Sequence, residues 1–191
     1  MGRYTEYFKE IWKLQANRKL LPITLFGVLY DNSTPFTPGS QLKIAEGTTE
    51  ALKVIASKGY DFLVISGQPP LRTKNLAQQD FENILNATRE VMESVGAKLR
   101  NAYYAPGTDK TDPYVKPNTG MFERAQSEMS LDWSELMYVG AEINDVKAAN
   151  KIKAKPVLIK SASTKTKAFE LTHQTKIQEY DSFLDFANSL E

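Results

Sequence analysis

The chain of 191 residues is long enough for one domain with a hydrophobic core, and 41% of its residues are hydrophobic. Its 24 basic and 23 acidic residues leave a formal charge of +1, so no nucleic-acid partner is expected. The absence of cysteine and the single histidine exclude disulfides, thiolate zinc sites and iron–sulfur clusters. No stretch has the roughly 20 apolar residues of a membrane span, and we expect a cytoplasmic or other reducing compartment.

The N-terminal segment, residues 3–20, has the pattern of an amphipathic helix. Its apolar side chains recur near helical spacing at Tyr4, Phe8, Ile11 and Trp12. We assign residues 1–21 to a helical extension and residues 22–191 to the main domain. The apolar stripe would either pack on that domain or form the interface to a protein partner.

From residue 23 onward, short apolar runs alternate with longer segments of helical periodicity. The predicted strands are Ile23–Leu29, Phe62–Ser66, Ala102–Tyr104, Met137–Gly140, Pro156–Ile159 and Lys176–Gln178. The predicted helices are Thr48–Lys58, Asp80–Val95, Gly120–Met129, Ile143–Lys151 and Tyr180–Leu190. This alternation indicates βα units around a parallel sheet. Because such sheets bind ligands beyond the carboxyl ends of their strands, the residues that follow each strand form the candidate site.

Four segments beside these strand ends carry the polar residues of interest: Thr24–Asn32, Val64–Gln68, Lys116–Met121 and Val139–Ala149. In order and spacing they resemble the four motifs of the haloacid dehalogenase superfamily, whose members are mostly phosphatases. The short helix between the first two segments and the Lys-Pro-x-x-Gly-Met run look like the capless histidinol-phosphatase and heptose-bisphosphate phosphatase branch. The resemblance implies a Rossmann-like three-layer α/β/α fold with a central, mainly parallel sheet and no large cap.

The resemblance also identifies the catalytic groups that this chain lacks. Related phosphatases begin with Asp-x-Asp-Gly, where the first carboxylate attacks phosphorus, the second is the acid/base and further carboxylates hold Mg²⁺. Aligned on Gly27, the chain has Thr24 in place of the nucleophile and Phe26 in place of the acid/base, and Ala141 replaces a magnesium ligand. A threonine hydroxyl is un-ionised at neutral pH, and phenylalanine transfers no proton. We therefore expect no catalytic residue at these positions and no bound cofactor.

Three polar residues of the resembled site are retained. Ser66 and Lys116 match the hydroxyl and the lysine that hold phosphate, and Asp145 matches a metal ligand that alone would bind Mg²⁺ weakly. Because an unpaired buried charge is costly, we expect Lys116 and Asp145 to form an ion pair. Members of the branch often have a zinc loop just before the lysine, but the corresponding residues 105–114 cannot hold zinc.

These features favour a catalytically degenerate phosphatase homologue that acts as a structural or binding component of a protein assembly. Two alternatives stay open. In a shifted register, Asp31 at the end of a longer first strand would be the nucleophile of a Mg²⁺-dependent phosphatase acting on small phosphorylated metabolites. Otherwise Ser66 and Lys116 would bind a phosphorylated ligand without hydrolysing it.

Overall fold

The computed structural model describes residues 18–33, 42–67, 77–105, 107–160 and 177–191. Within these ranges one parallel sheet has six strands in the order β3-β2-β1-β4-β5-β6. The strands are β1 (Lys19–Ile23), β2 (Tyr60–Ser66), β3 (Leu99–Tyr104), β4 (Met137–Gly140), β5 (Lys155–Ile159) and β6 (Gln178–Tyr180). The helical segments are α2 (Thr48–Ser57), α3 (Gln78–Ser94), α4 (Gly120–Met129), the 3₁₀ turn η1 (Trp133–Glu135), α5 (Ile143–Lys151) and α7 (Phe183–Ser189). The expected Rossmann-like α/β fold is confirmed.

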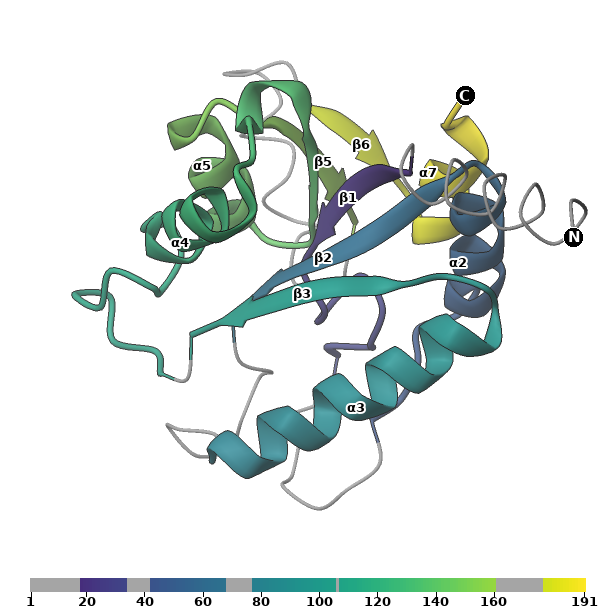
Figure 1. The fold of residues 1–191 in the computed structure, drawn as a ribbon, viewed down its shortest axis with the longest axis horizontal. Coiled ribbons are helices and arrows are strands. Elements are labelled where there is room, and N and C mark those ends of the chain that lie inside the picture. Colours follow the sequence, from purple (N-terminus) through teal and green to yellow (C-terminus); the bar gives the residue numbers. More distant parts are fainter. Residues whose placement is uncertain (1–17, 34–41, 68–76, 106, 161–176) are drawn as a thin grey trace, which may run out of the picture.

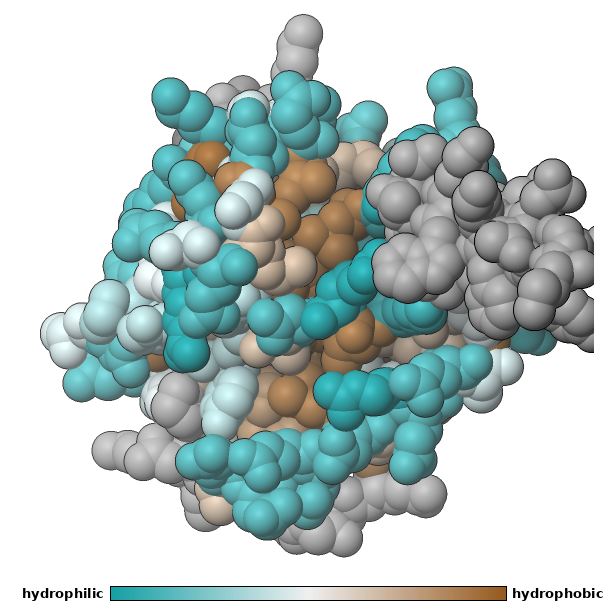
Figure 2. All heavy atoms as spheres, in the orientation of Figure 1, coloured by the Kyte–Doolittle hydropathy of each residue, from teal (hydrophilic) through white to brown (hydrophobic). Residues whose placement is uncertain are grey.

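Two helical layers enclose the sheet, as Figure 1 shows. Along β2, Phe62 and Val64 join the hydrophobic core beneath α2, α3 and α7, whereas Leu63 and Ile65 pack in a second core with α4 and α5. Every residue of β2 is buried, and its middle, Phe62–Ile65, is a continuous apolar run, as is typical of a central parallel strand covered on both faces. In Figure 2, hydrophilic side chains dominate the visible outer side around α3, and hydrophobic side chains show near the middle of the view. No helix in the described ranges is both long and apolar enough to cross a membrane.

The first strand begins earlier than the sequence pattern predicts. β1 occupies Lys19–Ile23, whereas the pattern predicts Ile23–Leu29. The sheet therefore starts inside the segment 1–21 that we assigned to the extension, and the last two residues of the predicted helix 3–20 are strand. Residues 1–17 lie outside the described part of the chain.

A proline inside this central strand explains why the pattern was misleading. Pro22 has no backbone N–H, whereas the N–H groups of a central strand normally donate to the neighbouring strands on both sides. β1, however, pairs with β4 only at Ile23, and the N–H of Thr24 then donates to the Val139 carbonyl of β4. Since bonding directions alternate along a strand, the missing N–H of Pro22 faces the side where pairing has not yet begun. Proline is tolerated at such a position.

The remaining differences are at element ends. β3 starts at Leu99 rather than at the predicted Ala102, because the exposed polar residues of an edge strand resemble a loop in sequence. β6 lies two residues later than predicted, and α7 begins three residues later and ends one residue earlier than predicted. Ser182 sets the start of α7, since its Oγ accepts the N–H of Asp185 at 3.0 Å.

A buried carboxylate fastens the amino ends of three neighbouring strands. Asp61 of β2 is 1% exposed and accepts hydrogen bonds from Arg18 Nε (2.5 Å) and Arg100 Nε (2.6 Å). Arg18 precedes β1, Arg100 belongs to β3, and Arg18 also donates to the Tyr60 carbonyl. This arrangement ties the order β3-β2-β1 together at the end of the sheet opposite the candidate site.

We expect Asp61→Asn to lower the free energy of unfolding by about 2 to 3 kcal/mol, because both arginines lose a charged partner in a buried position. Urea denaturation measures this change. The matched control is Asp109→Asn, an exposed residue whose amide oxygen can still accept from Thr111, as Asp109 Oδ1 does. Equal effects of the two substitutions would contradict the assigned role of Asp61.

Candidate functional site

The carboxyl ends of β1, β2 and β4 lie side by side at one end of the sheet. Thr24 follows β1 directly, and Ser66 is the last residue of β2. Ser66 Oγ lies 3.3 Å from Thr24 Oγ1 and accepts the N–H of Leu25 at 3.2 Å. Both hydroxyl-bearing residues are buried. The fold therefore brings the first two resembled segments together, as expected for residues that follow adjacent parallel strands.

Lys116 reaches this cluster from the loop before α4. Its Nζ donates to Asp145 Oδ1, to the Tyr138 hydroxyl (3.0 Å) and to Thr24 Oγ1 (3.2 Å). Nζ also lies 3.5 Å from the carbonyl oxygen of Ile65. An ammonium group has three hydrogens, so partners inside the protein account for all of them. The Lys116 side chain is 10% exposed, and the ion pair with Asp145 forms as the sequence predicts.

Asp145 lies in the first turn of α5, and its side chain is 3% exposed. Oδ1 accepts from Lys116, while Oδ2 accepts the N–H groups of Ala141 (2.9 Å) and Glu142 (3.0 Å). The amino end of a helix favours a negative charge at this position. Both carboxylate oxygens therefore already accept hydrogen bonds, and the side chain fixes the turn from β4 into α5.

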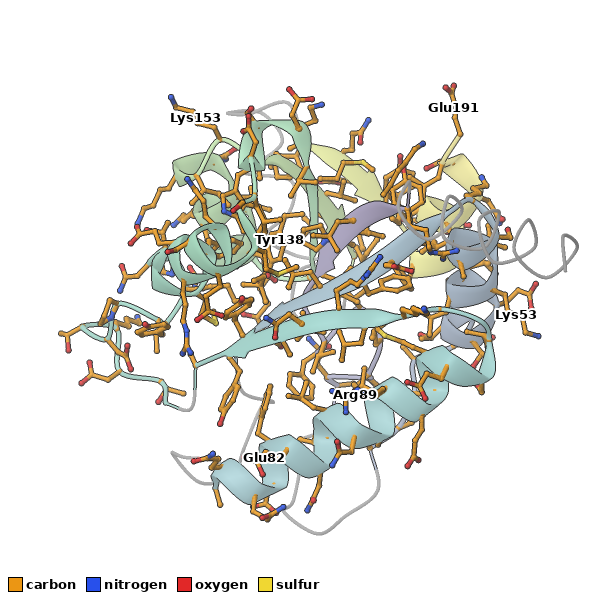
Figure 3. The ribbon with its side chains drawn as sticks, in the orientation of Figure 1. Lys53, Glu82, Arg89, Tyr138, Lys153 and Glu191 are labelled. Carbon is orange, nitrogen blue, oxygen red and sulfur yellow. The ribbon has the colours of Figure 1, made fainter. Side chains whose placement is uncertain are left out.

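Tyr138 is a member of the cluster that the sequence analysis treated only as a strand residue. Figure 3 labels it near the centre of the molecule. Its ring packs edge to face on Phe122 of α4, and its hydroxyl oxygen lies 2.8 Å from the Ile65 carbonyl and 3.1 Å from Asp145 Oδ1. Burial, and then the neighbouring Asp145 carboxylate, raises the pKa of Tyr138, so the phenol stays protonated. The sequence offers one sign that Tyr138 belongs to the site. It lies two residues before Gly140, on the face of β4 that packs towards α4.

The two positions that the resemblance assigns to an acid/base and to a metal ligand carry apolar, buried side chains, Phe26 and Ala141. Phe26 is buried in the hydrophobic core, with its ring centroid 6.2 Å from that of Tyr30. Gly27 has a φ of 86°, and a Cβ on it would lie 2.5 Å from the Cβ of Ala141. Ala141 is fully buried. The methyl group of Ala141 thus lies directly against the glycine turn that follows Thr24.

Asp31 occupies a turn rather than a strand end. β1 ends at Ile23, so the longer first strand that the shifted register requires does not form. Asp31 Oδ1 accepts the N–H of Ser33 at 2.8 Å, and Oδ2 accepts from Lys43 Nζ at 3.2 Å. The hydrogen bonds with Ser33 are the largest cause that lowers the pKa of Asp31. This carboxylate therefore stabilises a surface turn, and the expectation of a strand running on towards it is wrong.

The residues at this site do not fit the Mg²⁺ of related phosphatases. Thr24, Phe26 and Ala141 offer no carboxylate, and Asp145 is already paired with Lys116. Across the described ranges, no group of three or more His, Cys, Asp or Glu is placed to hold a metal ion. The expected interface residues lie outside the described part of the chain: Tyr4, Phe8, Ile11 and Trp12.

Breaking the ion pair from one side leaves a buried charge without its partner. We expect Lys116→Met and Asp145→Ala each to lower the free energy of unfolding by about 3 to 5 kcal/mol. The double variant should lose clearly less than the sum, because neither charge remains. Urea denaturation of the four proteins gives the coupling energy, with the exposed pair Glu50 and Lys53 as a control expected to couple by less than about 0.5 kcal/mol. Additive effects at Lys116 and Asp145 would contradict the pairing.

Comparison with characterised proteins places the fold and the site in context. The chain is 23% identical over 173 residues to the D-glycero-beta-D-manno-heptose-1,7-bisphosphate 7-phosphatase of Neisseria meningitidis serogroup A, covering 88% of this chain and 92% of the relative. It is 25% identical over 113 residues to the bifunctional histidine biosynthesis protein HisB of Xanthomonas campestris pv. campestris, of which it spans 30%. Both similarities agree with the branch that the sequence motifs resemble.

A solved structure and a family model extend this agreement. The D,D-heptose 1,7-bisphosphate phosphatase of B. bronchiseptica, solved with magnesium and phosphate, has a TM-score of 0.74 at 15% identity over 89% of this chain and 96% of its own. The family model of polynucleotide kinase 3 phosphatase matches residues 38–184, which is most of the chain. The chain therefore belongs to the polynucleotide kinase 3 phosphatase family, in the heptose-bisphosphate and histidinol-phosphatase-like branch of the haloacid dehalogenase superfamily.

Proposed function

We propose that this member of a phosphatase family acts by binding rather than by hydrolysis, as a structural or binding component of a protein assembly. The observation that carries the proposal is the state of Lys116: its charge is neutralised by Asp145, and its three hydrogens have acceptors inside the protein. A lysine in that state has no donor left for a substrate phosphate.

The replaced carboxylates support the same proposal. Phosphoryl transfer through a covalent intermediate needs a nucleophile that is ionised or has a base beside it. The Thr24 hydroxyl lies 3.2 Å from an ammonium that is paired with a carboxylate and 3.3 Å from the Ser66 hydroxyl, and neither group is a base that can take its proton. Phe26 cannot donate a proton to a leaving group. The resembled positions of the nucleophile, the acid/base and one metal ligand thus carry no carboxylate, and we propose that the site functions without Mg²⁺.

The relatives favour a second candidate function, that of a Mg²⁺-dependent phosphatase acting on small phosphorylated metabolites. Two of them are heptose-bisphosphate phosphatases by name, and one was solved with magnesium and phosphate. The family model, however, begins its match at residue 38 and so does not include Thr24 or Phe26. A phosphatase would need carboxylates other than those at the resembled positions.

We expect the full chain to hydrolyse neither an aryl phosphate nor a panel of sugar phosphates, with or without Mg²⁺. Phosphate release should stay at the level of buffer, and Thr24→Asp alone should not change this result, because Phe26 still lacks a proton to transfer. The Neisseria meningitidis phosphatase named above is the positive control for its own substrate. Mg²⁺-dependent release that disappears in Lys116→Ala would establish the phosphatase, whereas release that persists in this variant would indicate a contaminant.

We also expect inorganic phosphate to give no concentration-dependent increase in Tm beyond that of sulfate at equal ionic strength, because the donors of Ser66 and Lys116 are used within the protein. A bound ligand would stabilise the folded state in proportion to the logarithm of its concentration above Kd. Differential scanning fluorimetry against phosphate measures this. An increase in the native chain that rises with the logarithm of phosphate concentration, and that Ser66→Ala removes, would instead support the non-catalytic binding of a phosphorylated ligand.

A further inference from the structure

A groove runs along the outer edge of the sheet, away from the cluster around Lys116. Its volume is about 550 Å³, within the range of ligand and peptide sites. It is lined by Asn101, Ala102, Tyr103, Tyr104, Asp112, Tyr114, Arg124 and Glu128. Four of these residues are consecutive in β3, so the groove follows the strand's backbone, with the loop after β3 and helix α4 as its other walls.

The main chain of β3 offers unused hydrogen-bonding positions to this groove. β3 is the last strand of the sheet and, in the described ranges, pairs with β2 alone. The N–H of Ala105 donates to the carbonyl oxygen of Ser66 in β2. Because directions alternate along a strand, the N–H groups of Ala102 and Tyr104 point away from β2. The N–H of Ala102 donates to Asn101 Oδ1 at 2.8 Å. Because this bond joins adjacent residues of the same strand, a carbonyl group of an added strand could replace it.

At residues 101–104 this edge lacks two of the usual protections against strand addition, charged side chains and prolines. Exposed edges are normally guarded by charged residues, prolines or bulges. Residues 101–104 carry no charge and no proline, and the irregularity in the β2–β3 pairing lies before them, between Phe62 and Leu63. β6 at the opposite edge is only three residues long. β3 is therefore the better site for an added strand.

The walls of the groove have a defined charge. Glu128 accepts from Arg124 Nε and from the Tyr103 hydroxyl, both at 2.8 Å, and the Arg124 guanidinium lies 5.9 Å from the Tyr103 ring centroid. Burial and the bond to Glu128 raise the pKa of Tyr103 to about 12, so the phenol remains neutral. Among the described residues of the lining, the two carboxylates, Asp112 and Glu128, exceed the one guanidinium by a single negative charge.

We infer that this groove binds a short extended peptide of a partner protein, which adds to β3 as a new strand and places a basic side chain near Asp112. The strand edge supplies main-chain hydrogen bonds, and the tyrosines supply contact area. The edge is recessed between α4 and the loop, so a single extended segment fits it better than the edge of another folded sheet. The inference holds whether or not the chain hydrolyses phosphate.

The test is selection of a display library of short random peptides on the full chain. We expect enrichment of sequences with alternating apolar residues and one lysine or arginine. Ala102→Pro should weaken the selected peptides about tenfold or more, since it removes an outward N–H without affecting the bonds to β2. Ala102→Val retains the N–H and is the matched control. In the NMR spectrum of the native chain, the amide signals of Ala102 and Tyr104 should shift on binding.

A second variant keeps the test decisive if the proline disturbs folding. Asp112→Asn retains an oxygen that can accept the Tyr114 N–H, as Asp112 Oδ1 does now, but removes the charge. It should weaken the selected basic peptides severalfold, whereas Asp109→Asn, outside the groove, should not. No enrichment, or peptides insensitive to both groove variants, would overturn the inference. Dimerisation of the native chain that Ala102→Pro abolishes would also overturn it and assign the edge to a second copy.

Discussion

The buried ion pair between Lys116 and Asp145 is the interaction on which the carboxyl end of the sheet depends. It links the loop before α4 to the first turn of α5, and its hydrogen bonds extend to β1, β2 and β4 through Thr24, Ile65 and Tyr138. Two opposite charges can stay buried only when each also has polar partners. Each has them here, which explains why a lysine and a carboxylate can stay almost free of solvent.

The three replaced positions are consistent with this pair and with one another. Asp145 is the counter-ion of Lys116. If Asp145 were also replaced, the buried ammonium would lose that counter-ion. Ala141 packs against the turn at Gly27, where a Cβ on residue 27 would lie 2.5 Å from the Ala141 Cβ, and Phe26 joins the core. At this end of the sheet, the described side chains are held by internal hydrogen bonds and apolar contacts.

The sequence predicted the fold class, the bounds of α4, α5 and β4, and the ion pair, because long apolar periods and motif spacing report them directly. It failed at β1, where Pro22 looked like a break between elements although its missing N–H faces an unpaired side. It also missed Tyr138, because the hydroxyl of a strand tyrosine gives no sign of its partners until the neighbouring strands are placed. The Asp61 cluster was hidden for the same reason: its two arginines are distant in sequence.

The balance of charge at the strand ends has a structural consequence. A phosphatase site gathers several carboxylates whose mutual repulsion is relieved when a divalent cation binds, so part of its stability depends on that cation. Here the ammonium of Lys116 is a covalent part of the chain and stands opposite the carboxylate of Asp145. The positive charge that neutralises Asp145 is therefore part of the polypeptide itself, and it is supplied by a side chain 29 positions earlier in the sequence.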